Sequence, residues 1–114
     1  MGDKMKIVRG DTAQFKFQRL DSNNEPILIE ADAIYFTVKK NYFAEDFVIQ
    51  KKLSDMTFDE QGYYHFKIEP EDTNDLLYKD YVYDIEVIVG DYKQTISKGV
   101  LTITEEVTYN SNEV

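Results

Sequence analysis

Alternation of side-chain type between Tyr81 and Val89 is the sequence feature that most limits what this chain can fold into. The odd positions of this run are all apolar or aromatic, whereas the even positions include Asp84 and Glu86. Successive side chains of a β-strand point to opposite faces, so the run predicts a strand with one buried face and one wetter face. A Gly90-Asp91 step follows, and glycine supplies the positive φ that a tight turn needs. Residues 81–103 are therefore predicted to form one hairpin.

Shorter runs of the same period recur through the chain, separated by turn-forming segments such as residues 21–26 and 59–62. These runs are predicted to be strands at residues 13–17, 34–38, 47–53 and 64–68, with Phe47, Ile49 and Leu53 facing inward in the third. The predicted core collects Phe15, Phe17, Ile34, Phe36, Val38, Phe66, Ile68, Ile85, Val87 and Leu101.

One segment, residues 70–77, breaks the β pattern and is predicted to be a short crossover helix. Pro70 suits a first helical position, and the acids behind it suit the free N–H groups of a helix start. About seven strands and one helical turn predict an all-β fold, an antiparallel β-sandwich. A small β-barrel is the alternative, because alternation alone does not separate the two. The 114 residues suit one domain, which we place at residues 1–104, with a polar C-terminal tail at 105–114.

The second strand of the hairpin has a conflict of register. Ile96 has the opposite parity to Leu101 and Ile103, so a regular strand cannot place all three on one face. A β-bulge adds one residue to a strand and so restores the register. The intervening Gly99 is the predicted position of this bulge.

Tyrosine is abundant, with nine residues, and Tyr81 and Tyr83 lie near the start of the predicted penultimate strand. In sandwich folds a tyrosine at this place often bonds its hydroxyl to the backbone of the preceding corner. We predict that structural role here. An interface role is the alternative, because tyrosine gives a large contact area.

The formal net charge of −9 resides entirely in the second half of the chain. Residues 1–57 hold 9 Lys/Arg and 9 Asp/Glu, whereas residues 58–114 hold 4 and 13. Such a half would repel nucleic acid and anionic membranes, so neither is a predicted partner. The acids form either a solvated surface that aids solubility or a patch that steers a basic protein partner.

Residues with catalytic or ligand-binding chemistry are scarce, and we predict no catalytic, cofactor or metal site. Cysteine is absent, which excludes thiolate chemistry and cysteine metal sites. The single histidine, His65, is predicted to point to solvent beside Tyr63 and Lys67. Nucleotide-binding and hydrolase motifs are missing, and no run approaches the ~20 apolar residues of a membrane span. The expectation is a soluble protein that is not an enzyme.

Two series of motifs resemble small immunoglobulin-like structural proteins of tailed phages and prophages. The first comprises Gly10-Asp11-Thr12 with Phe15 and Phe17, a polar turn with Pro26, and Ala33-Ile34-Tyr35-Phe36-Thr37-Val38-Lys39; it is similar to the N-terminal domain of phage upper baseplate proteins. The second comprises Ile68, Pro70-Glu71-Asp72-Thr73, Tyr81-Val82-Tyr83-Asp84-Ile85-Glu86-Val87 and Lys98-Gly99 with Leu101-Thr102-Ile103, and resembles small virion or prophage proteins. Together they cover roughly residues 7–107.

This resemblance implies an immunoglobulin-like sandwich and a non-enzymatic virion protein, a decoration or adaptor component of head, neck, tail or baseplate. It implies a protein made in the bacterial host cytoplasm and placed in the virion in several copies of a symmetric assembly, against other virion proteins. We expect a basic partner surface to contact Asp84 and Glu86, or Val107 and Tyr109 in the tail.

The alternative function is a carbohydrate- or receptor-binding β-module at a phage fibre or cell surface. Such a module needs aromatic side chains on exposed loops, and the candidates are Tyr42, Phe43 and Tyr63.

Overall fold

The computed structural model describes residues 3–105, and these form strands with very little helix. The strands are β1 (Asp3–Val8), β2 (Ala13–Gln18), β3 (Ala33–Lys39), β4 (Phe47–Lys52), β5 (Thr57–Phe58), β6 (Tyr63–Ile68), β7 (Asp80–Val89) and β8 (Tyr92–Thr104). A 3-10 turn, η1 (Leu53–Asp55), follows β4, and one helical turn, α1 (Pro70–Thr73), follows β6. The all-β prediction is confirmed.

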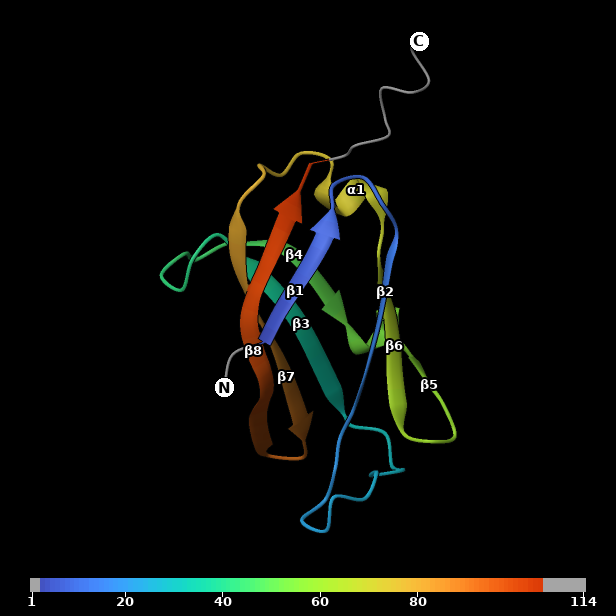
Figure 1. The fold of residues 1–114 in the computed structure, drawn as a ribbon. Helices are drawn as coiled ribbons and strands as arrows, with labels where there is room; N and C mark the ends of the chain where they lie inside the picture. The colour runs from blue at the N-terminus through green and yellow to red at the C-terminus, as the bar shows by residue number, and fades with distance from the viewer. Residues whose placement is uncertain (1–2, 106–114) are drawn as a thin grey trace.

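The strands make two sheets that share one core. The five-stranded sheet has the order β1-β8-β7-β3-β4, and the three-stranded sheet has the order β2-β6-β5. Strand β1 is parallel to β8, and the other pairs are antiparallel. Figure 1 shows β2, β6 and β5 on one side of the molecule and β1, β8, β7 and β3 on the other. No strand in residues 3–105 links the two sheets into a closed barrel.

The core lies between the sheets and is built from the alternating positions that the sequence predicts. Eight of the ten predicted core residues are buried, the least exposed being Ile34, Phe36, Val38, Ile68 and Leu101 at 0%. Phe15 and Phe17 are half-buried and pack against this cluster from β2. The ring of Phe66 in β6 lies 4.8 Å from that of Phe36 in β3, so aromatic contacts join the two sheets.

The β7–β8 hairpin is confirmed, but the predicted position of its bulge is wrong. Gly99 is regularly paired with Tyr83. The register instead shifts between Ile85 and Glu86, which pair with Ser97 and Thr95 and leave Ile96 as the extra residue. The extra residue at this point allows Ile96 and Leu101, which have opposite parity, both to contact the core, and Ile96 is half-buried there.

Strand β4 also departs from the prediction, because Phe47 does not face inward. Val38 pairs with Ile49, whereas the next residue, Lys39, pairs with Phe47, so the register shifts at this point. Ile49 is buried, but Phe47 is 53% exposed. Leu53, predicted to extend this strand, lies in η1 and is half-buried.

The crossover segment forms the predicted helical turn and a tyrosine corner. Pro70 occupies the first turn of α1, and the Asp72 carboxylate accepts the Glu69 N–H at 2.7 Å. The Tyr81 hydroxyl donates to the Leu77 carbonyl at 3.0 Å, which confirms the predicted corner bond. These bonds fix the start of β7 and hence the strand that carries Asp84 and Glu86.

Candidate functional site: the outer face of the five-stranded sheet

The outer face of the five-stranded sheet carries a row of polar side chains across three strands. Asp84 lies between Tyr83 and Ile85, which are both buried, so the pleat turns the Asp84 side chain to the outer face. Thr37 of β3 pairs with Asp84, and Asp84 pairs with Lys98 of β8. A hydroxyl, a carboxylate and an ammonium group therefore lie in register on neighbouring strands.

This row is part of a hollow of about 540 Å³, which we name the Asp84 hollow. Its lining includes the polar residues Thr37, Lys39, Tyr42, Asp84, Thr95, Ser97 and Lys98, and Val82 adds an apolar surface. Thr95 and the neighbouring bulge residue Ile96 both belong to this lining. The bulge in β8 therefore forms part of the wall of the hollow.

Tyr42 reaches the hollow from the loop between β3 and β4, which projects from the body of the molecule in Figure 1. The Asn41 side chain accepts the Phe43 N–H at 2.9 Å, and this local bond shapes the loop. Tyr42 is 68% exposed and Phe43 is 94% exposed. The structure thus brings Tyr42 and Asp84, which the sequence linked to two different functions, into one hollow. Phe43 does not line it.

Burial raises the pKa of the Asp84 carboxyl above its ordinary value, the charge of Glu86 raises it further, and Lys39 opposes both. Glu86 lies two positions along the same strand, and its Oε2 is 3.7 Å from Nζ of Lys93. Lys39 and Lys98 line the hollow beside Asp84. The two predicted acids are thus locally balanced by lysines, and their contact with a basic partner stays a prediction.

The two other predicted contact residues, Val107 and Tyr109, lie outside the described residues.

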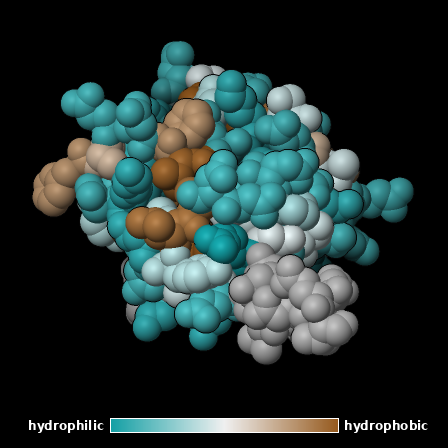
Figure 2. Space-filling view, turned by 90° about the horizontal axis from the view of Figure 1, so that it is seen from above, coloured by the Kyte–Doolittle hydropathy of each residue, from teal (hydrophilic) through white to brown (hydrophobic). Residues whose placement is uncertain are grey.

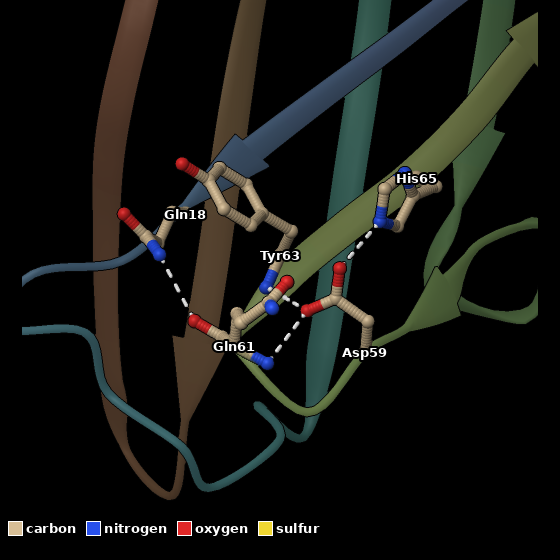
Figure 3. Close-up of polar contacts among 5 residues, drawn as sticks. All are labelled: Gln18, Asp59, Gln61, Tyr63 and His65. Atoms are coloured by element: carbon tan, nitrogen blue, oxygen red, sulfur yellow. Dashed lines mark hydrogen bonds and ion pairs between the residues drawn. The ribbon is translucent and has the colours of Figure 1, made fainter.

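The turn between β5 and β6 holds a second polar cluster, centred on Asp59 (Figure 3). One carboxylate oxygen accepts the N–H groups of Gln61 and Tyr63 at 2.9 and 3.0 Å, and the other lies 2.8 Å from Nε2 of His65. The hydrogen bond with His65 is the main cause that lowers the pKa of the Asp59 carboxyl, and the Tyr63 N–H adds to it. Gln18 donates to the Gln61 carbonyl at 2.9 Å, which ties the turn to β2.

His65 faces outward, as predicted, with 43% of its side chain exposed, but the sequence analysis missed its partner Asp59. The sequence did contain a signal for this contact. Asp59 begins the predicted turn at residues 59–62, and His65 lies in the strand that follows this turn, so the two side chains can meet across it. A hollow of about 530 Å³ beside His65 is lined by three lysines, Lys16, Lys51 and Lys67. Lys51 pairs with Asp72 at 2.8 Å, and Lys16 lies 4.4 Å over the Tyr63 ring. Two of the three lysines are thus engaged, and neither of the predicted contact acids, Asp84 and Glu86, lines this hollow, so it is the weaker candidate site.

Figure 2 looks down on the end of the molecule that carries α1, where apolar side chains are visible among polar ones. Among the large apolar side chains of the described residues, Phe43, Phe47 and Leu77 are 94%, 53% and 71% exposed. Within residues 3–105, no group of three or more potential ligand side chains could hold a metal ion. The described part of the chain also has no helix long and apolar enough to cross a membrane.

No protein-family model and no curated protein sequence matches this chain. Among solved structures, the chain is similar to part of an endo-β-1,4-mannanase from Thermotoga petrophila, with a TM-score of 0.61 and 12% identity. The match covers 91% of this chain but only 18% of the mannanase chain. At this identity the likeness shows a shared fold alone, in a segment that is a small part of the larger protein.

Proposed function

We propose that the two sheets form an immunoglobulin-like sandwich. The strand order supports this assignment, because β7, β8 and β3 are neighbours in one sheet while β2, β6 and β5 form the other. The Tyr81 corner bond, at the start of the penultimate strand, is typical of such sandwiches.

We propose further that the chain is a non-enzymatic virion protein of a tailed phage or prophage, a decoration or adaptor component. The observation that carries this proposal is the order of the resembling motifs, each of which falls on a separate element. The first series starts at the turn before β2 and continues in β3, and the second runs through α1, β7 and β8. A protein of this kind acts through surfaces that repeat with the symmetry of the particle.

The C-terminal segment is the surface that we propose for attachment to a basic partner. Residues 105–114 contain three glutamates and no lysine or arginine. Strand β8, which precedes this segment, ends at Thr104 at the end of the sandwich that carries α1 (Figure 1), where Glu71 and Asp75 are exposed. By contrast, Asp84 lies among lysines. Exposed ion pairs alone contribute little, so apolar contacts of Val107 and Tyr109 must add to the docking.

Truncation after Thr104 tests this proposal. We expect the melting curve to stay nearly unchanged, because every buried core residue of the described chain precedes the cut. We expect the truncated protein to be missing from particles produced by the strain that carries the gene. A full-length variant with Val107→Ala and Tyr109→Ala should be incorporated poorly as well, which separates apolar contact from charge. Particles that carry the truncated protein at the normal copy number would contradict the proposal and move the interface to the sandwich faces.

A further inference from the structure

We propose that the Asp84 hollow binds a neutral carbohydrate. This inference goes beyond the proposed virion role and does not depend on it. It rests on the juxtaposition of Tyr42 with the polar row of Thr37, Asp84 and Lys98 on the outer face of the five-stranded sheet.

The polar row offers the hydrogen-bonding groups that a sugar ring uses. A carboxylate accepts hydrogen bonds through two oxygens, so Asp84 can accept from two neighbouring sugar hydroxyls. The ammonium of Lys98 is a donor only, and the hydroxyl of Thr37, which accepts a hydrogen bond from the Gln50 amide at 3.2 Å, can donate its own proton to a ligand. Because these residues are paired across strands, the backbone ladder fixes the backbone positions from which the three side chains extend.

Tyr42 supplies the apolar surface that sugar C–H groups require. Its ring is 68% exposed, so it can cover one side of a ligand held by the row. A tyrosine has an apolar ring and a polar hydroxyl, which matches the mixed surface of a pyranose. Val82 adds apolar surface within the same hollow.

The charges of the hollow favour an uncharged ligand over an ion. Asp84 stands in the middle of the row and repels an anion, while Lys39 and Lys98 in the same lining repel a cation. A ligand rich in hydroxyl groups can pair with both signs of charge. The volume of about 540 Å³ is within the range of small-molecule sites. The hollow is open and has one aromatic wall, so we expect a dissociation constant on the order of 1 mM.

The test is an NMR titration of the isolated ¹⁵N-labelled protein with mannotetraose, cellotetraose and β-1,4-galactotetraose, in separate experiments. We expect at least one of them to shift the amide signals of residues 37–42, 82–84 and 95–98. Absence of shifts with all three at concentrations well above the expected dissociation constant would overturn the proposal. Shifts confined to residues outside the outer face of the five-stranded sheet would also overturn it.

Matched variants separate the hollow from its surroundings. Tyr42→Ala and Asp84→Ala should each weaken binding about tenfold, the loss expected when one set of contacts is removed. Phe43→Ala is the control for Tyr42, because Phe43 is the next residue of the same loop and does not line the hollow. Glu86→Ala is the control for Asp84, because Glu86 is an acid of the same strand that does not line the hollow. Binding that survives both hollow variants unchanged contradicts the proposal.

Salt and an anionic ligand distinguish binding of a neutral sugar from binding of an anion by the lysines of the hollow. Binding of a neutral sugar through hydrogen bonds should persist at about 1 M NaCl, where charge interactions are screened within ~3 Å. Preference for galacturonate oligomers over the neutral probes, with loss of binding in salt, would show that the lysines bind anions and would overturn the assignment of a neutral ligand.

Discussion

Replacement of Phe36 by alanine removes the side chain that connects the two sheets at the centre of the core. Phe36 is 0% exposed and belongs to β3 of the five-stranded sheet. Its ring lies 4.8 Å from that of Phe66 in the other sheet and 5.8 Å from that of Tyr83 in its own sheet. Alanine at this position leaves a cavity that neither rigid sheet can close fully.

The expected loss in the free energy of unfolding is about 3–5 kcal/mol, which combines the lost transfer energy with the cavity that remains. For a domain of this size that loss corresponds to a fall in melting temperature of about 12–20 °C. Urea denaturation followed by circular dichroism measures the free energy, and calorimetry measures the melting temperature. The slope of the urea dependence should stay the same if only stability changes.

Phe43→Ala is the matched control, since it makes the same substitution at a side chain that is 94% exposed. We expect it to change the free energy of unfolding by less than about 0.5 kcal/mol. Buried aromatic side chains usually lose several kcal/mol of unfolding free energy when they are replaced by alanine. A loss below about 1 kcal/mol for Phe36→Ala would therefore refute the assignment of this face to the core.

Three further predictions concern single polar groups. Tyr64→Phe leaves the Ala31 N–H without the hydroxyl that accepts it at 2.9 Å, so urea denaturation should show a loss of about 1–3 kcal/mol. Asp59→Asn should lower the melting temperature at neutral pH. The hydrogen bond with His65 lowers the pKa of Asp59 in the folded state. The Asp59 carboxylate therefore stabilises the fold at pH values above the pKa of the unfolded state, and this stabilisation is lost as the pH falls through the pKa of the folded state. Asp84→Asn should do the opposite and raise the melting temperature at neutral pH, since burial raises the folded pKa of Asp84 and its ionised form destabilises the fold. Both differences from the parent chain should vanish in acid, and a difference that is constant with pH would contradict these assignments.

Much of the fold could be predicted because it depends on local periodicity. Residues such as Ile34, Phe36 and Val38 alternate without interruption, and one-sided burial then fixes which face they occupy. The Pro70 helix start and the Tyr81 corner were also predictable, since each depends on residue types at short spacing. In this chain, uninterrupted alternation of apolar and polar residues therefore predicts correctly both the strand and its buried face.

The misplaced features depend on pairing between strands, which periodicity does not specify. A conflict between Ile96 and Leu101 shows that a bulge must exist, but any residue between them could carry it. The prediction chose Gly99 because glycine often marks a bulge, whereas in the structure the extra residue is Ile96. Phe47 was misplaced for the same reason, because its register is set by the partner strand β3.

The candidate site was visible only in parts. The sequence singled out Asp84 as an outward acid and Tyr42 as a loop aromatic, yet it gave no means of joining them. Their proximity follows from the pairing of β3 with β7 and from the path of the loop after β3. Lys98, the third member of the site, was missed because its place beside Asp84 depends on the bulge at Ile96.

Quantitative mass spectrometry of purified particles tests the proposed virion role most directly. Particles from the strain that carries the gene are measured with isotope-labelled standard peptides of this chain and of the portal protein. The proposal predicts that the chain is present at a fixed number of several copies per particle, in proportion to the symmetry of the component that holds it. A chain that is abundant in the lysate and absent from the purified particles would contradict it.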